Sequence, residues 1–174
     1  MDFETHMRCF VAAFVEPESA AEIARQISLP PGLRHLEPSG WHVTLRFIGE
    51  IPLTRTDELL GAIRMLGAGT LEVEGIALVG LPRGTAARVV ALELARTDQL
   101  VEWAALLEQG MGSAGRSQRL LRPHISLARS QPPIRFERQL LDASIAVRLH
   151  APALYRSVLT GSGVRYHRVS TRPR

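Results

Sequence analysis

The sequence predicts an α+β fold in which a strand–helix–strand unit occurs twice. Segments 41–47 and 123–129 each contain a histidine, an apolar residue, a hydroxyl residue and a leucine, in that order. A strand-like segment precedes each motif at a similar distance, 34 residues from Arg8 to His42 and 36 residues from Arg88 to His124. Apolar residues make up 45% of the 174 residues, enough to build a core. We therefore expect mostly antiparallel strands with the helices on the outside.

In the first copy, residues 8–14 have the pattern of a buried strand, and residues 17–28 that of an amphipathic helix. Pro30-Pro31-Gly32 ends this helix. The first motif then lies on a strand over 41–49. A second helix is predicted over 54–66, with Thr54 as its candidate N-cap.

The remaining segments form the second copy and its neighbours. One or two strands interrupted by glycine are predicted over 71–81. The second copy follows as a strand at 88–94, a helix at 97–109 and the second motif strand at 124–129. Strands at 144–149 and 153–160 complete the chain, and we expect the tail 170–174 to be frayed.

The two motifs predict a site made of two histidines and two hydroxyls. Alternation of apolar and polar residues is the period of a half-buried strand, so the apolar residues of each motif should face the core. His42 and Thr44 then share the opposite face, as do His124 and Ser126. The motifs are 82 residues apart, and the fold must bring them together.

Arginine accounts for all 21 basic residues, against 17 acidic residues, and the sequence pI is about 10.4. A guanidinium fork suits phosphate oxygens, but a GC-rich genome also favours arginine codons, and we prefer that explanation for most of these residues. Arg116, Arg119, Arg122 and Arg129 differ, because they run from a Gly/Ser-rich segment at 110–117 into the second motif. This cluster predicts a phosphate-bearing partner.

Other features narrow the class of protein. Cys9 is the single cysteine, which excludes an internal disulfide and a site of several thiolates, and we expect it to pack as a small apolar residue. No apolar run is long enough to span a membrane. The N-terminus carries Asp2 and Glu4 and lacks a signal pattern, so we predict a cytoplasmic protein. We expect no membrane partner, and the sequence indicates no obligatory protein partner.

Two histidines and two hydroxyls can carry out phosphoryl chemistry without a metal ion or other cofactor. Imidazole, with an ordinary pKa near 6.5, can take or give a proton at neutral pH, and two rings on opposite sides of a phosphorus supply a base and an acid. The hydroxyls can donate hydrogen bonds to the non-bridging oxygens. No further metal ligand shares either motif, so neither predicts a metal site. The alternative is that these are ordinary polar residues at a strand edge.

The segments that carry these motifs resemble the two-histidine (2H) phosphoesterases, and among them the bacterial and archaeal RNA 2′,3′-cyclic phosphodiesterases once called 2′-5′ RNA ligases. The resemblance covers nearly the whole chain, through segments 7–13, 41–50, 122–129 and 154–166. It implies one bilobal domain over 1–174, with mostly antiparallel sheets flanking a central cleft. Each lobe would contribute one motif, 42–45 or 124–127.

The resemblance also implies roles for individual residues. His42 would be the proton donor and His124 the proton acceptor in the hydrolysis of RNA 2′,3′-cyclic phosphate ends to 2′-phosphates, without a metal. Arg129 would bind the phosphate. Strict alternation turns the Arg129 side chain away from His124, so this role requires a bend after Leu127.

Further substrate contacts are expected from Arg122, Phe47 and Tyr155. Trp41, Phe47, Tyr155 and Tyr166 are candidates to stack on a terminal base, and core or wall packing is the alternative for each. Four other functions stay open: cleavage of 2′-5′ linkages, hydrolysis of a cyclic nucleotide ester, RNA ligation and non-catalytic binding of RNA ends.

Overall fold

The computed structural model describes residues 6–84, 86–112, 122–161 and 163–170. Within these residues the chain forms three α-helices, two 3₁₀ turns and nine strands. In chain order they are β1 (His6–Phe14), α1 (Pro17–Gln26), β2 (Arg34–His35), η1 (Pro38–Gly40), β3 (His42–Pro52), η2 (Leu53–Arg55), α2 (Thr56–Arg64), β4 (Leu71–Leu81), β5 (Ala87–Leu94), α3 (Asp98–Met111), β6 (His124–Ile134), β7 (Gln139–Leu149), β8 (Ala153–Thr160) and β9 (Gly163–Arg168).

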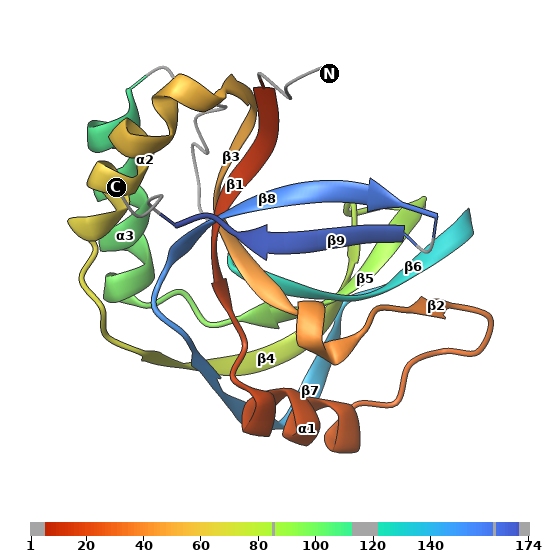
Figure 1. Cartoon of the computed structure of the whole chain (residues 1–174). Helices are drawn as coiled ribbons and strands as arrows, with labels where there is room; N and C mark the ends of the chain where they lie inside the picture. Colours follow the sequence, from red (N-terminus) through yellow and green to blue (C-terminus); the bar gives the residue numbers. More distant parts are fainter. Residues whose placement is uncertain (1–5, 85, 113–121, 162, 171–174) are drawn as a thin grey trace.

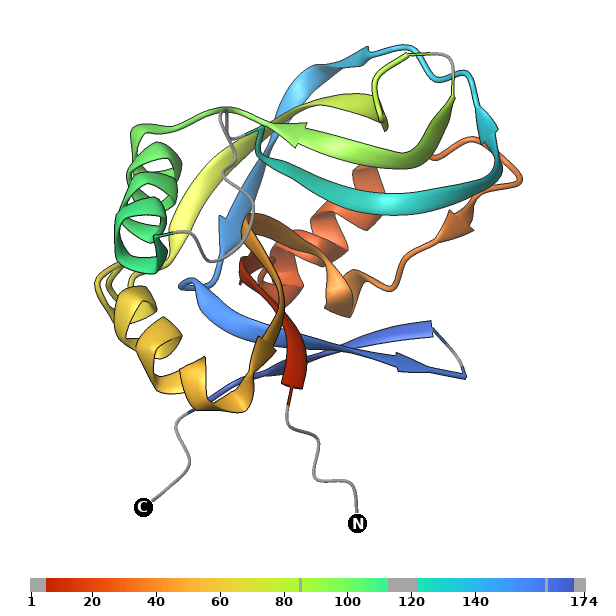
Figure 2. The same cartoon turned by 90° about the horizontal axis from the view of Figure 1, so that it is seen from above.

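The described strands form one antiparallel sheet in the order β7-β4-β5-β6-β3-β1-β8-β9, with β2 paired to β6. Its two halves meet where β6 contacts β3, and Figure 2 shows the ribbons of β5 and β6 opposite those of β8 and β9. The units β1–α1–β3 and β5–α3–β6 are the predicted repeat. The predicted α+β class and mostly antiparallel pairing are confirmed.

The helices cover the outside of the sheet (Figure 1). Pro17 starts α1, and Ala20 and Ile23 form its buried face. The side chain of Thr97 caps α3 by accepting a hydrogen bond from the backbone N–H of Leu100 at 3.3 Å. The buried residues of α3 follow the helical period: Leu100, Trp103, Leu107 and Met111. Helices α2 and α3 lie side by side at one end of the molecule (Figures 1 and 2).

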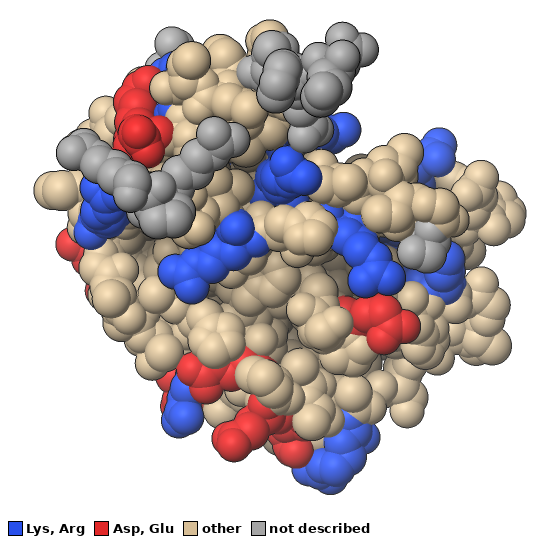
Figure 3. Space-filling model, viewed as in Figure 1, with Lys and Arg blue, Asp and Glu red and all other residues tan. Residues whose placement is uncertain are grey.

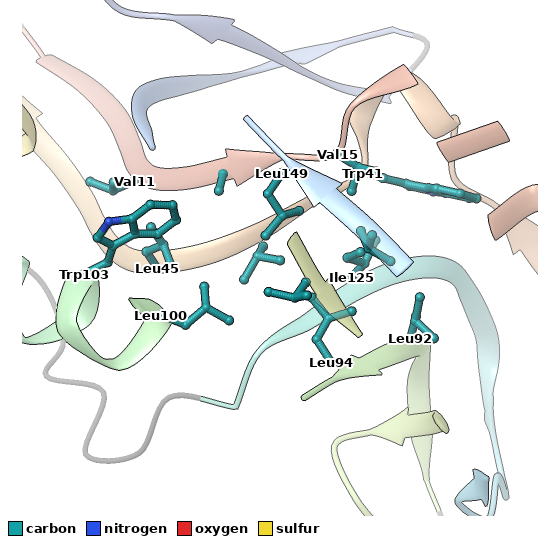
Figure 4. Packing of buried hydrophobic residues seen from close by; sticks show 14 of the residues in the cluster. Val11, Val15, Trp41, Leu45, Leu92, Leu94, Leu100, Trp103, Ile125 and Leu149 are labelled. Atoms are coloured by element: carbon teal, nitrogen blue, oxygen red, sulfur yellow. The ribbon is translucent and has the colours of Figure 1, made fainter. Parts of the chain in front are cut away.

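One apolar core underlies both motif strands (Figure 4). Val43 and Ile125 are fully buried, and Leu45 and Leu127 are exposed by only 2% and 1%, as the alternation predicts. Cys9 is also buried in β1, and burial raises the pKa of its thiol to about 11. Packing of these residues fixes the position of the motif strands.

Several predicted element boundaries were wrong. Helix α2 begins at Thr56 rather than at Thr54, because the 3₁₀ turn η2 includes Thr54, and the N-cap position falls on Arg55. The strand over 71–81 is continuous, although its register shifts between Gly75 and Ala77. A Cβ at Gly75 would lie 2.9 Å from a methyl group of Leu92, so a larger residue there would require the Leu92 side chain to shift.

The second half of the sheet has longer strands than the sequence predicted, and two strands were not predicted separately. β6 continues past its two prolines to Ile134, which pairs with Ala87, and β7 begins at Gln139. β2 has only two residues, and β9 pairs with β8 as a hairpin at the end of the sheet. Prolines are compatible with pairing at the margins of a sheet, which is why β6 can pass them.

No helix in the described part of the chain is both long and apolar enough to span a membrane.

A buried arginine joins the first motif strand to the end of α3. The side chain of Arg46 is 4% exposed, pairs with the carboxylate of Glu108 and donates from Nη2 to the carbonyl of Gly112 at 2.9 Å. Gly112 ends α3 with a φ of +52°, a conformation that favours glycine.

We predict that Arg46→Gln lowers the free energy of unfolding by about 1.5–3 kcal/mol, the range for hydrogen bonds to charged groups. For a chain of this size each kcal/mol shifts Tm by about 2–4 °C. Arg55→Gln is the matched control, because Arg55 pairs with Glu58 on the exposed surface. Thermal unfolding checks both variants, and an equal Tm for the two would contradict the anchoring role of Arg46.

Candidate active site at the junction of the motif strands

The two motif strands contact each other through one residue pair, Val43 and Ile125, which face the core. The strands are antiparallel, so continuing this register by one residue places His42 opposite Ser126 and Thr44 opposite His124. All four side chains are partly exposed. They share the face opposite to Val43 and Ile125, which we call the motif face. The structure therefore brings the four predicted residues together.

The histidines are diagonal neighbours in this arrangement. Diagonal residues of an antiparallel pair lie about 7–8 Å apart, whereas directly opposite residues have Cβ atoms about 4.5–5.5 Å apart. Each histidine thus has a hydroxyl residue as its direct neighbour on the other strand, and the second histidine one step further away. A pseudo-twofold axis through the Val43–Ile125 pair relates the two halves.

The same irregularity occurs in both motif strands. β1 pairs with β3 through Ala12–Thr44 and then Val11–Arg46, which leaves Leu45 extra. β5 pairs with β6 through Ala91–Ser126 and then Val90–Ala128, which leaves Leu127 extra. A one-residue bulge reverses the phase of the residues that follow it. The first seven residues of β3 and β6 accordingly share one burial pattern.

The bulge returns Arg129 to the motif face. Residues 127 and 128 are both buried, and Arg129 is exposed. After the bulge, Arg129 therefore lies on the same face of the strand as His124 and Ser126. This is the bend that the sequence required after Leu127. Phe47 occupies the corresponding position in β3 and is 39% exposed.

Backbone carbonyls hold both imidazoles in the same way. Nδ1 of His42 lies 2.7 Å from the carbonyl oxygen of Gly40, and Nδ1 of His124 lies 2.8 Å from that of Arg122. A carbonyl oxygen only accepts hydrogen bonds, so Nδ1 carries a proton in each ring. In the neutral rings Nε2 is then the basic nitrogen. Each ring is oriented by the residue two positions before it.

Aromatic rings surround His42. Phe14 stacks against it at 4.9 Å between ring centroids, Phe10 lies at 5.2 Å, and Tyr166 meets it edge-on at 5.0 Å. Burial lowers the pKa of His42; the Gly40 carbonyl opposes this shift, and the nearby His124 adds to it. The imidazole of His42 is therefore neutral at neutral pH in the free protein.

Beside His124 the corresponding neighbour is a charged residue. Glu93 pairs directly with His124 across β5 and β6, in the position that Phe14 takes beside His42. The Glu93 carboxylate accepts hydrogen bonds from Arg83 at 2.7 Å and from Arg138 at 2.6 Å. The two halves of the site thus share their strand pairing and the backbone contacts of the histidines, but the side chains next to the two histidines differ.

The predicted aromatic contacts, Tyr155, Phe47 and Trp41, have different surroundings in the structure. Tyr155 stacks on Phe14 at 4.2 Å, which places it in the aromatic group beside His42, and burial raises its pKa. The Arg8 guanidinium lies over the ring of Phe47 at 5.3 Å. Trp41 is a core residue, because it is 6% exposed and its indole N–H donates to the Leu36 carbonyl.

The predicted arginine cluster falls only partly within the structure. Arg116 and Arg119 lie outside the described residues, and Arg122 is exposed. Figure 3 shows further basic side chains gathered over β8 and β9, where Arg165 and Arg168 are exposed. Among the described residues, no group of three or more His, Cys, Asp or Glu side chains could hold a metal ion.

Sequence reasoning missed Phe10, Phe14 and Glu93 as neighbours of the histidines. The two phenylalanines lie in the predicted first strand, where their hydrophobicity indicated a buried strand and nothing more. Glu93 interrupts the apolar run of β5, and that was the available signal.

Comparison with known proteins adds to this geometry. The family model of LigT-like phosphoesterases matches residues 14–87, which include the first motif. This match bears out the resemblance to LigT-like phosphoesterases over the segment that it covers. A comparison of the sequence with curated proteins finds no match.

Several solved structures, Escherichia coli LigT among them, share this fold over nearly the whole chain. TT0787 of Thermus thermophilus is 23% identical with a TM-score of 0.79, covering 94% of this chain and 96% of its own. Escherichia coli LigT complexed with 3′-AMP is 20% identical with a TM-score of 0.74, and LigT complexed with NADP+ is 21% identical with a TM-score of 0.72. Each covers 95% of this chain and 96% of LigT. The LigT-like fold therefore extends through the second motif.

The lowered pKa of His42 predicts a pH-dependent stability. The unfolded chain, where the histidine pKa is near 6.5, binds the proton more readily than the folded protein does. The contribution of His42 to stability is thus present above pH 6.5 and is lost as the pH falls through its lower folded value.

We expect the fall in Tm between pH 7.5 and pH 5 to be smaller for His42→Phe than for the wild type. Phenylalanine packs well in the aromatic group and has no ionisable group that takes up a proton. His35→Gln, at an exposed position, serves as the control. Equal losses in wild type and His42→Phe would show that burial does not disfavour the charged ring.

Proposed function

We propose that this protein hydrolyses RNA 2′,3′-cyclic phosphate ends to 2′-phosphates by metal-independent acid–base catalysis. The observation that carries the proposal is the arrangement of His42 and His124 on the motif face. They are diagonal neighbours, each with Nδ1 on a backbone carbonyl and Nε2 as the basic nitrogen. Two such rings can serve opposite sides of one phosphorus. The relatives of known structure support a phosphoesterase, and the choice of substrate is our proposal.

In the proposed reaction a water oxygen attacks phosphorus in line with the departing 3′ oxygen. Nε2 of His124 takes a proton from the water, and Nε2 of the protonated His42 gives one to the 3′ oxygen. The P–O3′ bond breaks, and the product has gained one water as a 2′-phosphate and a 3′ hydroxyl. Proton exchange with solvent then restores both rings.

The hydroxyls and Arg129 would stabilise charge on the phosphate. Ser126 lies opposite His42 and Thr44 opposite His124, so each hydroxyl is placed beside a ring that serves an apical oxygen. They would donate to the non-bridging oxygens, where charge develops. The bulge turns Arg129 to the same face, where its guanidinium would pair with the phosphate.

The donor role of His42 requires the substrate to change its pKa. In the free protein burial keeps this ring neutral. A phosphate anion beside it favours the charged form and raises the pKa. We therefore expect the pKa of His42 to rise when a nucleoside 2′-phosphate binds. NMR titration of the ring with and without this product measures it, and an unchanged value would contradict the donor role.

The direct test uses an oligonucleotide with a 2′,3′-cyclic phosphate end in the presence of EDTA. We expect a mass gain of one water in the wild type. His42→Ala and His124→Ala should each lower the rate roughly 10²–10⁴-fold with the fold retained, because a positioned acid or base is lost. Activity that is lost in EDTA and restored by a divalent metal would contradict this mechanism and indicate metal-assisted hydrolysis. Near-wild-type activity in either variant would reject the two-histidine assignment.

The same assay separates the related functions. Joining of two strands indicates a ligase, cleavage of a 2′-5′ linked dinucleotide indicates a 2′-5′ phosphodiesterase, and binding without turnover indicates an RNA-end binding module. Phosphorus NMR assigns the roles of the histidines. A 2′-phosphate product supports His42 as the donor, and a 3′-phosphate product reverses the two roles.

We predict that Arg129→Gln lowers kcat/KM for the cyclic phosphate end about 10²-fold, the scale of a lost donor to a developing oxyanion. Arg129→Lys keeps the charge without the fork and should retain part of this effect. Steady-state kinetics of the two variants measure the difference. An Arg129→Gln enzyme with unchanged kcat/KM would place this side chain outside the reaction.

A further inference from the structure

A pocket of about 340 Å³ lies beside the second half of the motif face. Its walls include Val79 from β4, Arg83 from the β4–β5 connection, and Arg135, Glu137 and Arg138 from the segment between β6 and β7. None of these residues belongs to either motif. The pocket therefore is separate from the four residues that were predicted to carry the chemistry.

The sheet register gives the distance from this pocket to the motif residues. Val79 pairs with Ala91, and Ala91 pairs with Ser126, so the three side chains form one row on the same face. Two strand spacings of about 4.8 Å separate Val79 from Ser126, or about 10 Å in all. The register thus places one wall residue of the pocket, Val79, on the face that Ser126 shares with His124.

Glu93 joins the pocket to the second histidine. It is opposite His124 in the sheet, and its carboxylate binds one nitrogen of Arg83 and one of Arg138. The Glu93 side chain is 19% exposed, whereas those of Arg83 and Arg138 are 51% and 43% exposed. The carboxylate thus fixes the two guanidiniums from the inside while their outer edges face the solvent.

Charge and geometry at this pocket suit a phosphate. Three arginines, Arg83, Arg135 and Arg138, stand against the carboxylates of Glu93 and Glu137, so the group is net positive. A guanidinium has five N–H donors, and the contact with Glu93 engages one nitrogen of each fork. Forks that are already oriented lose less side-chain freedom when they bind an anion.

We propose that this pocket is a second phosphate subsite, which binds the phosphodiester next to the terminal cyclic phosphate of an RNA strand. The inference rests on the proposed function, because it takes the terminal phosphate to lie between His42 and His124. The next phosphate is the nearest further anion that a strand carries, and Arg83 and Arg138 are the fixed cations beside His124. The protein then prefers an oligonucleotide end to a mononucleotide.

The test compares a nucleoside 2′,3′-cyclic phosphate with a dinucleotide that ends in the same cyclic phosphate. The readout is the ratio of kcat/KM for the dinucleotide to that for the mononucleotide. We expect the wild type to favour the dinucleotide. Arg83→Gln and Arg138→Gln should each lower this ratio about 5- to 20-fold, because each loses a charge-assisted hydrogen bond to phosphate.

Arg55→Gln is the matched control, since Arg55 also pairs with a glutamate at 2.7 Å but does not line the pocket. Its ratio should equal that of the wild type. A merely structural role for Arg83 and Arg138 would lower kcat/KM for both substrates together and leave the ratio unchanged. That outcome, or a wild-type ratio near one, overturns the subsite.

A binding measurement separates this proposal from the proposed function. The probe is a fluorescent tetranucleotide with a 2′-phosphate end, titrated by fluorescence anisotropy at several salt concentrations. The double variant Arg83→Gln/Arg138→Gln should flatten the slope of log Kd against log salt by about 0.7, the value for one phosphate contact of a single strand.

An unchanged slope rejects the subsite even where the cyclic phosphate is hydrolysed. A flattened slope in a protein that hydrolyses no cyclic phosphate supports the subsite and rejects the reaction.

Discussion

The pairing of β3 with β6 at Val43 and Ile125 is the contact on which the candidate site depends. Both residues are fully buried, so the core fixes this register, and a slip by one residue would turn all four motif side chains toward the core. The same contact joins the two halves of the sheet. One buried apolar pair therefore determines both the continuity of the fold and the spacing of His42 and His124.

The alternation within the motifs was predictable because it depends on the local period of a strand. The bulges were not, since residues 45–47 and 127–129 continue a plausible strand pattern in the sequence. The only sequence signal was chemical: Arg129 could reach the phosphate only if the strand bent after Leu127. The structure places the bend there and repeats it after Thr44, where no role of a side chain had required it.

The neighbours of the histidines depend on the register between distant strands, which the repeat in the sequence does not give. Aligning the two copies at Arg8 and Arg88 matches Glu93 with Ala13, whose side chain is buried in the core. The structure instead pairs Glu93 with His124 as it pairs Phe14 with His42. An error of one residue exchanges the faces of a strand. Aligning the two copies of the repeat thus predicted the strands correctly. It misplaced Glu93, the side chain that distinguishes the surroundings of His124 from those of His42.

A symmetric backbone with asymmetric neighbours suits a reaction that needs an acid and a base. The pseudo-twofold gives His42 and His124 the same support through backbone carbonyls, so symmetry alone offers no reason for different roles. Burial of His42 among aromatic rings disfavours its charged form. Beside His124, Glu93 and its two arginines form a polar surface that can orient an anion. A strand with an aromatic base at one end and further phosphates along it, as in the proposed substrate, would then bind in one direction, because each half of the site suits only one of its ends.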